Sequence, residues 1–187
     1  HDGQDLETLL KNADTAMYRA KEVGRNAFQF YASEMNTATL DRLLMESNLR
    51  RALAQKEFIL HYQPLVNLET GVIIGVEALI RWQHPELGMI MPDSFIHVAE
   101  ETGLINPIGD WGLCEACRHA KTWSDGGLPP LVMAVNVAPV QFRQPGFVEM
   151  VAGALAASGL DASLLELELT ERTVMHDADI NLGTLSA

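Results

Sequence analysis

The chain has 187 residues, of which 48% are hydrophobic, and its formal net charge is -12 at pH 7. A chain of this length and composition can bury one sizeable core, and none of its apolar runs reaches the roughly 18 residues of a membrane span. The negative charge argues against a nucleic-acid polymer as partner, because backbone phosphates repel an acidic surface. A small phosphate ligand bridged by divalent cations remains compatible, since clustered carboxylates bind hard cations such as Mg²⁺. We expect this segment to make no membrane contact.

The first 35 residues are predicted to form one helix and one strand. Apolar residues recur at helical spacing from Asp5 to about Val23, Gly24 supplies a stop signal, and the segment 27–31 is typical of a strand. Two such elements leave most of their apolar surface in water. Residues 1–35 are therefore expected to be the tail of a larger domain, and the absence of an initial methionine agrees with a missing upstream part.

The second segment, residues 36–187, is predicted to alternate strands and helices. A loop at 67–71 that ends in a glycine joins its first two strands, and its length predicts an antiparallel hairpin. The alternation of helices and strands after this hairpin predicts an α/β fold. The expected strands are 58–65, 72–82, 131–137 and 164–169, and the expected helices are 39–55, 92–102, 107–124, 147–158 and one that begins after Asp177.

Two cysteines, Cys114 and Cys117, form a Cys-x-x-Cys pair inside a predicted helix. The apolar residues around them recur at helical spacing, which predicts that both sulfurs pack on the buried stripe of that helix. The sequence has no second cysteine pair to complete a zinc site. We expect both thiols to be reduced core residues of an intracellular protein.

Three predicted strands carry polar side chains on one face. Glu77 and Arg81 share a face of the second strand, because side chains alternate along a strand. Asn136 ends the third strand, and Glu166 and Glu168 share a face of the fourth. In a parallel β/α barrel, catalytic groups gather at the carboxyl ends of the strands, and these oxygen ligands suit Mg²⁺ or Mn²⁺. A metal site and a solvated polar face both remain open from the residues alone.

Several motifs of the second segment resemble those of the EAL domain family, which is named for the triplet Glu77-Ala78-Leu79. The resemblance covers about residues 40–187 and is specific because the motifs keep the family's order and spacing. Besides the triplet, the matching motifs are Tyr62-Gln63-Pro64, Arg81, Phe95-Ile96, the segment 99–105, and Glu168-Leu169-Thr170-Glu171.

The upstream tail is similar to the end of a GGDEF domain. The segment 13–21 followed by Gly24-Arg25-Asn26 resembles that family's closing helix and turn. The chain is therefore expected to be cut from a tandem GGDEF-EAL protein, with 1–35 as the GGDEF remnant and 36–187 as the N-terminal part of the EAL domain.

The resemblance implies an α/β fold that is an incomplete TIM-like (β/α) barrel with an antiparallel first strand, preceded by a helix-strand remnant of an α/β GGDEF domain. It implies hydrolysis of cyclic di-GMP to linear pGpG with two divalent cations, Mg²⁺ or Mn²⁺. By motif match, the metal ligands are Glu77, Asn136 and Glu168. Arg81 is implied to contact a phosphate of the substrate and Gln63 to line the nucleotide pocket.

Four further residues complete these expectations. Glu171 is implied to steady a loop that carries a pair of metal-binding aspartates, whereas Glu166 matches no functional position. Lys21 and Arg25 lie four residues apart, where a helix puts them on one side. They match positions that contact nucleotide phosphates in GGDEF domains, and a solvated basic face is the alternative.

A complete TIM barrel has about 250 residues, so this chain is expected to hold one half of it. The paired aspartates, the catalytic lysine, a later glutamate and a late glutamine are expected beyond Ala187. An open half-barrel exposes a strand edge and apolar surface, so we expect the fragment alone to be inactive and prone to aggregate.

Three interpretations of the parent protein stay open. The first is an active phosphodiesterase, the second is a degenerate EAL domain that acts as a cyclic di-GMP receptor, and the third is a bifunctional protein dominated by diguanylate cyclase activity. We expect the parent to be a cytoplasmic homodimer with upstream sensor domains, and missing upstream segments leave a tether to the inner membrane open.

Overall fold

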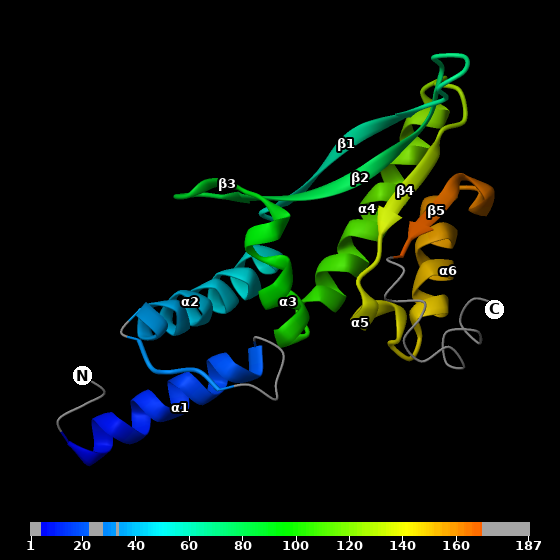
Figure 1. The fold of residues 1–187 in the computed structure, drawn as a ribbon. Coiled ribbons are helices and arrows are strands. Elements are labelled where there is room, and N and C mark those ends of the chain that lie inside the picture. The colour runs from blue at the N-terminus through cyan, green and yellow to red at the C-terminus, as the bar shows by residue number, and fades with distance from the viewer. Residues whose placement is uncertain (1–4, 23–27, 33, 170–187) are drawn as a thin grey trace. The chain divides into compact units, whose positions relative to one another are not determined.

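The computed structural model describes residues 5–22, 28–32 and 34–169 (Figure 1). Contacts divide the chain into two compact units, 1–48 and 49–187. The first unit holds α1 (Leu6–Glu22) and the first part of α2 (Glu34–Gln55), which continues into the second unit. Among the helices within the described ranges, none has both the length and the apolar composition of a membrane span.

The start of α1 agrees with the predicted boundary. Asp5 caps the helix, because its Oδ1 accepts a hydrogen bond from the backbone N–H of Thr8 at 2.8 Å and its Oδ2 accepts one from the Thr8 hydroxyl at 2.9 Å. Both hydrogen bonds lower the pKa of Asp5 because they favour the charged carboxylate, and the bond from the backbone N–H has the larger effect.

The strand predicted at 27–31 is wrong for the part that is described. Residues 28–32 adopt no regular secondary structure. A strand requires a neighbour for its backbone hydrogen bonds, and within the described ranges the sheet takes its strands from the second unit alone. Phe28 and Phe30 are instead exposed, and their rings meet edge to face with centroids 5.4 Å apart.

The second unit is built on a mixed five-stranded sheet. Its order is β1-β2-β4-β5, and β3 pairs with the end of β2. The first two strands are antiparallel, whereas β2, β4 and β5 run parallel. This arrangement confirms the predicted α/β fold and its antiparallel first strand. The strands are β1 (Phe58–Val66), β2 (Ile73–His84), β3 (Gly88–Ile90), β4 (Val132–Asn136) and β5 (Leu165–Glu168).

Helices connect the parallel strands, and Figure 1 shows α4 and α6 side by side behind β4 and β5. The helix predicted at 92–102 is divided in two, because Phe95 between the two parts has a non-helical φ of -132°. Between β2 and β4 lie η1 (Pro92–Ser94), α3 (Ile96–Thr102) and α4 (Ile105–Asp125). Between β4 and β5 lie α5 (Pro139–Phe142), α6 (Phe147–Ser158) and η2 (Ala162–Leu164).

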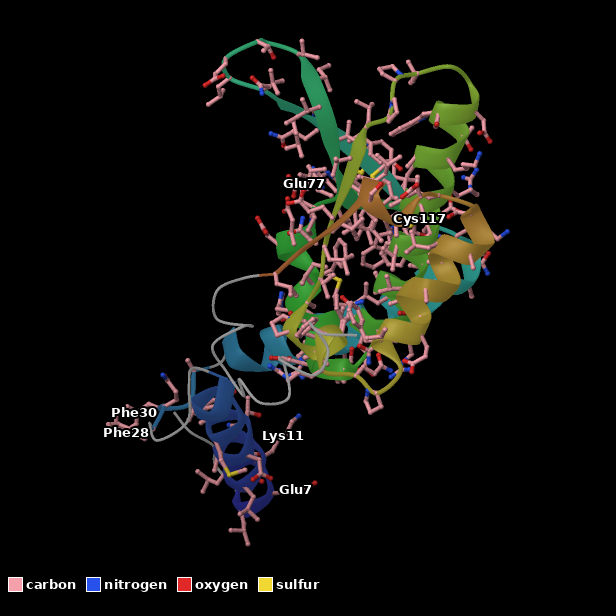
Figure 2. All side chains as sticks on the ribbon, turned by 90° about the vertical axis from the view of Figure 1, so that its right-hand side faces the viewer. Glu7, Lys11, Phe28, Phe30, Glu77 and Cys117 are labelled. Atoms are coloured by element: carbon pink, nitrogen blue, oxygen red, sulfur yellow. The ribbon has the colours of Figure 1, made fainter. Side chains whose placement is uncertain are left out.

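The core lies between the sheet and the helices α4 and α6. Alternate residues of β2, β4 and β5 face these helices, so the opposite face carries the polar residues of these strands together with the apolar Leu79 and Ala134. Figure 2 labels Cys117 in this core and Glu77 on the other face of the sheet. The buried members of the core are Val76, Ala78, Leu113, Ala116, Cys117, Ala120, Met133, Val135, Ala154 and Leu160.

The two cysteines differ in their surroundings. Cys117 is fully buried, as predicted, but Cys114 is exposed. The buried residues of α4 around them lie at 113, 116, 117 and 120, and Cys114 is turned about 100° from its neighbour Leu113. The prediction that both sulfurs are buried is therefore wrong for Cys114. Neither thiol forms a disulfide.

Candidate functional site

The registers of the sheet place four residues in one row on the face opposite the helices. Gln63 of β1 pairs with Glu77 of β2, Glu77 pairs with Ala134 of β4, and Ala134 pairs with Glu166 of β5. Paired residues of neighbouring strands point to the same face. The side chains of Gln63, Glu77 and Glu166 therefore belong to one surface, with the small Ala134 between the two glutamates.

A second row lies two residues farther along β2, β4 and β5. In it, Asn136 pairs with Glu168, and Leu79 pairs with His61 of β1. Asn136 and Glu168 are the last residues of their strands, as the barrel interpretation predicts. Glu77 lies inside β2 rather than near its carboxyl end, because β2 continues to His84 to pair with β3.

One hydrogen bond joins the two rows. The Asn136 side-chain amide donates to Glu77 Oε1 at 2.6 Å. This bond fixes the amide, because its nitrogen faces the carboxylate and its oxygen is the remaining acceptor. Two residues that are 59 positions apart in the sequence thus meet through their polar atoms.

Like charges surround Glu168. Burial raises the pKa of the Glu168 carboxyl above its ordinary value, and the negative charges of Glu77 and then Glu166 raise it further. Glu166, which no motif assigns, is therefore part of the same acidic surface. Within the described ranges, no group of three or more His, Cys, Asp or Glu side chains is arranged to hold a metal ion. The set of Glu77, Glu168 and Asn136 differs from such a group because one of its three members is an amide.

Arg81 lies on the face of Glu77, four residues along β2, in the position opposite Ile59. Its Nη1 donates to the backbone carbonyl of Ile80 at 2.8 Å, and four residues of strand separate the two backbones by about 13 Å. Gln63 is exposed on β1. The structure therefore brings Gln63, Glu77, Asn136 and Glu168 together and leaves Arg81 at a distance.

The remaining predicted site residues cannot be placed. Glu171 and Arg25 lie outside the described residues, and so does the predicted helix after Asp177. Lys21 belongs to the last turn of α1, but its side chain is also outside the described part.

Sequence reasoning missed the support behind Asn136. Gln141 is buried, and its Oε1 accepts a hydrogen bond from the backbone N–H of Ala138, two residues after Asn136. Its amide packs on Gly109 of α4, where an added Cβ would lie 1.7 Å from Nε2. No local pattern signals the contact of Gln141 with Gly109, because these two residues are distant in the sequence. An apolar cavity of about 290 Å³ adjoins these residues at the end of β4.

Comparison with known proteins identifies the family. The family model of the EAL domain matches residues 46–186. The chain belongs to the EAL domain family. The bifunctional diguanylate cyclase/cyclic di-GMP phosphodiesterase MucR of Pseudomonas aeruginosa is 48% identical to this EAL chain over 184 residues, which cover 98% of the chain and 27% of MucR.

A second curated relative is the cyclic di-GMP phosphodiesterase PdeR of Escherichia coli. It is 36% identical over 183 residues, which cover 98% of the EAL chain and 27% of PdeR. The chain thus spans about a quarter of the length of both curated relatives.

A solved structure supports the fold of this EAL chain. The complex of the PaMucR phosphodiesterase with c-di-GMP matches with a TM-score of 0.74 and 47% sequence identity, over 76% of this chain and 58% of that chain. The predicted TIM-like α/β fold is confirmed for the EAL segment by this likeness.

Proposed function

We propose that this EAL domain belongs to a bacterial signalling protein that hydrolyses cyclic di-GMP to linear pGpG. The observation that carries the proposal is the hydrogen bond between Asn136 and Glu77, with Glu168 beside Asn136 in the same row. These are the three metal ligands that the resemblance to the EAL family implies, and they come from three different strands. The names of MucR and PdeR, both cyclic di-GMP phosphodiesterases, support the same substrate.

We further propose that Glu77, Asn136 and Glu168 hold divalent cations, Mg²⁺ or Mn²⁺, with two in the complete site. The donor set consists of carboxylate and amide oxygens, which these hard cations prefer. The hydrogen bond to Glu77 holds the amide nitrogen of Asn136, so the amide oxygen is the atom for a cation. When bound, the cations polarise the phosphodiester and activate water.

Two residues of the same face are proposed to bind the substrate. Gln63 lies across from Glu77 on β1, about 5 Å away between backbones, and is proposed to line the nucleotide pocket. Arg81 is proposed to leave the Ile80 carbonyl and bind a phosphate of the substrate, because a guanidinium forms stronger hydrogen bonds with an anion than with a neutral carbonyl. The substrate then extends along β2 between Glu77 and Arg81.

The remaining parts of the proposal concern the parent protein. Residues 1–35 are proposed to be a GGDEF remnant in which Lys21 and Arg25 contact nucleotide phosphates, and 36–187 to be the N-terminal part of the EAL domain. Glu171 is proposed to steady a loop of the metal site. A match to MucR over 98% of the chain, tail included, supports the tandem arrangement. The parent is proposed to be a cytoplasmic homodimer with upstream sensor domains.

The experiment that tests this function replaces the central carboxylate in the full-length protein. Glu77→Ala should lower the formation of pGpG from cyclic di-GMP in Mg²⁺ by more than about 100-fold, because it removes a proposed metal ligand and the partner of Asn136. Glu69→Ala is the matched control, since Glu69 is an exposed residue of the β1–β2 loop. Hydrolysis by Glu77→Ala at the wild-type rate would contradict the proposal.

Two other functions are tested in the same reactions. The first is a receptor that binds cyclic di-GMP without cutting it, which would result if either of the paired aspartates expected beyond Ala187 were lost. The name of MucR includes diguanylate cyclase, which favours a bifunctional parent. Binding without pGpG would support the receptor, and cyclic di-GMP formed from GTP in excess of pGpG would support the cyclase.

A further inference from the structure

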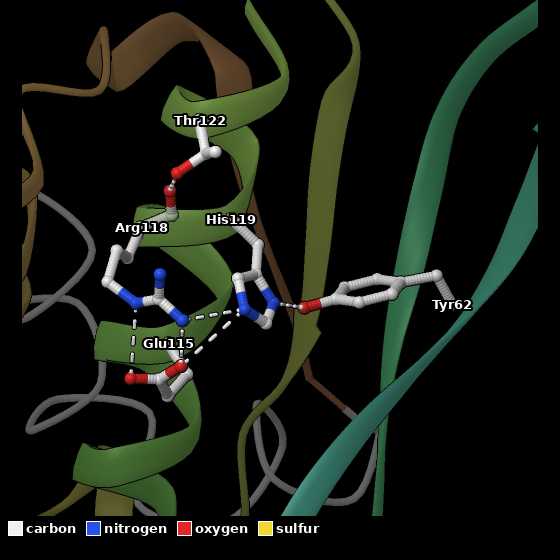
Figure 3. A network of polar contacts seen from close by, with 5 residues as sticks. All are labelled: Tyr62, Glu115, Arg118, His119 and Thr122. Atoms are coloured by element: carbon white, nitrogen blue, oxygen red, sulfur yellow. Dashed lines mark hydrogen bonds and ion pairs between the residues drawn. The ribbon is translucent and has the colours of Figure 1, made fainter. Parts of the chain in front are cut away.

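A network of polar and aromatic contacts joins β1 to α4 on the helix side of the sheet (Figure 3). The Tyr62 hydroxyl of β1 is hydrogen-bonded to Nδ1 of His119 in α4. The Tyr62 ring also meets Trp123 edge to face, with centroids 4.7 Å apart, and His119 edge to face at 5.8 Å. His119 and Trp123 stack on each other with centroids 6.2 Å apart. Tyr62 is thus held by two aromatic side chains one helical turn apart.

The charged partners of His119 decide which ring nitrogen carries the proton. Nη2 of Arg118 lies 2.7 Å from Nε2 of His119, and a guanidinium can only donate hydrogen bonds. Glu115 Oε2 also faces Nε2, but at 3.6 Å it is too far to accept a hydrogen bond from it. Nε2 is therefore the acceptor, and the single proton of the neutral imidazole is on Nδ1, which faces Tyr62. Glu115 fixes Arg118, because its two carboxylate oxygens accept from Arg118 Nη2 at 2.6 Å and from Nε at 3.3 Å. His119 thus donates to the Tyr62 oxygen.

This contact acts on a strand that pairs only with β2 among the described strands. Leu60 and Tyr62 of β1 pack against the core of α4 and α6, and Phe58, the first residue of β1, meets Trp111 of α4 with ring centroids 6.0 Å apart. Leu60 provides apolar packing without direction, whereas the Tyr62 hydrogen bond has a defined geometry. Tyr62 therefore fixes the position of β1 relative to α4 at the residue next to Gln63.

We propose that Tyr62, held by His119, is a positioning residue for Gln63. The two neighbours point to opposite faces of β1, so the helix-side bond of Tyr62 sets where Gln63 stands opposite Glu77 on the other face. This inference rests on the proposed function, in which Gln63 lines the nucleotide pocket. Tyr62 and His119 touch no substrate, and their effect is expected on binding rather than on the chemical step.

The test is a double-mutant cycle on the full-length protein, with KM and kcat for cyclic di-GMP as readouts. Tyr62→Phe should raise KM about fivefold, the equivalent of one hydrogen bond, and change kcat by less than about twofold. If Tyr62 acts through Gln63, the double variant Tyr62→Phe/Gln63→Ala should have the KM of Gln63→Ala alone.

Two variants of the partner residue separate positioning from general stability. His119→Asn puts an amide N–H near the former Nδ1 and should keep KM close to that of the wild type, whereas His119→Gln puts it near Nε2 and should reproduce Tyr62→Phe. Thr122→Val is the matched control, because the Thr122 hydroxyl donates to the Arg118 carbonyl on the same helix at 2.8 Å and is not bonded to Tyr62. If the protein binds without cutting, Kd replaces KM throughout.

Each outcome decides the inference. An unchanged KM in Tyr62→Phe, a loss confined to kcat, or additive effects in the double variant would overturn it while the proposed function stands. If Tyr62→Phe fails to fold, the contrast between His119→Asn and His119→Gln carries the same decision. A wild-type protein that neither binds nor hydrolyses cyclic di-GMP overturns the proposed function, and this inference with it.

Discussion

Gly75 is the residue at which β2 and β4 begin to pair, opposite Val132. An alanine Cβ at this position would lie 2.7 Å from the Val132 carbonyl oxygen and 3.2 Å from the Val132 Cβ. The nearer atom belongs to the backbone and cannot turn away as a side chain can. The two strands would therefore have to separate by about 0.7 Å at this pair to lengthen the 2.7 Å contact to the 3.4 Å of an ordinary van der Waals contact.

We expect Gly75→Ala to lower the free energy of unfolding by about 1–3 kcal/mol, the usual cost of an oversized side chain in a packed interior. The gain that alanine brings by restricting the unfolded chain is smaller than this cost. The parallel pairing of β2 with β4 comprises four residue pairs, the last of which joins Ala78 to Val135. A shift at its first pair therefore acts on the Glu77–Ala134 pair two residues away and should weaken the hydrogen bond from Asn136 to Glu77.

The assay is denaturant unfolding followed by tryptophan fluorescence, since Trp82 is fully buried in the second unit. Gly153→Ala is the matched control, because Gly153 lies inside α6 and an added Cβ meets no atom within 4 Å. That control should stabilise the protein by about 0.5–1 kcal/mol. Equal stabilities for Gly75→Ala and the wild type would refute the argument that backbone closeness requires glycine here.

Two further predictions concern titration. Burial and then the charge of Arg118 lower the pKa of His119 in the folded protein. The contribution of His119 to stability is therefore complete above about pH 6.5 and is lost as the pH falls towards the lowered pKa. This loss of stability with falling pH should be absent in His119→Asn, and its persistence in that variant would assign it to another group. In the metal-free protein, NMR titration should show that Glu77→Gln lowers the pKa of Glu168 more than Glu166→Gln does, because the Glu77 charge acts on it more strongly. The reverse order would show that Glu166, on the same strand as Glu168, is the stronger of the two charges and would contradict this prediction.

The parts of the fold that could be predicted are those with a regular local pattern. The helix expected at 147–158 is α6 with the same bounds, and the hairpin loop gave the antiparallel pair β1 and β2. The elements that were missed are short: β3 has three residues and α5 has four. Segments of this length contain less than two periods of any pattern, so their formation depends on the neighbours that pack against them.

The candidate site also has features that a local pattern predicts and features that it does not. Alternation along single strands predicted the common faces of Glu77 with Arg81 and of Glu166 with Glu168, but it could not predict which strands are neighbours. The row from Gln63 to Glu166 depends on three registers, and a register is set by tertiary packing. The packing of Gln141 on Gly109 and the contact of Tyr62 with His119 are likewise invisible to a local pattern, because each joins residues that are distant in the sequence.

The hydrogen bond between Glu77 and Asn136 also bears on the order in which the domain folds. Gln63 and Glu77 face each other across a single hairpin, which closes a short loop, whereas Asn136 reaches Glu77 only after the 59-residue separation that contains α3 and α4 is closed. Short loops close at a smaller entropic cost than long ones, and parallel pairing is slow for this reason. We expect the hairpin with Gln63 and Glu77 to form early in folding and Asn136 to join it late. A chain emerging from the ribosome would then hold one nucleotide-binding residue and the first cation ligand before the other ligands arrive.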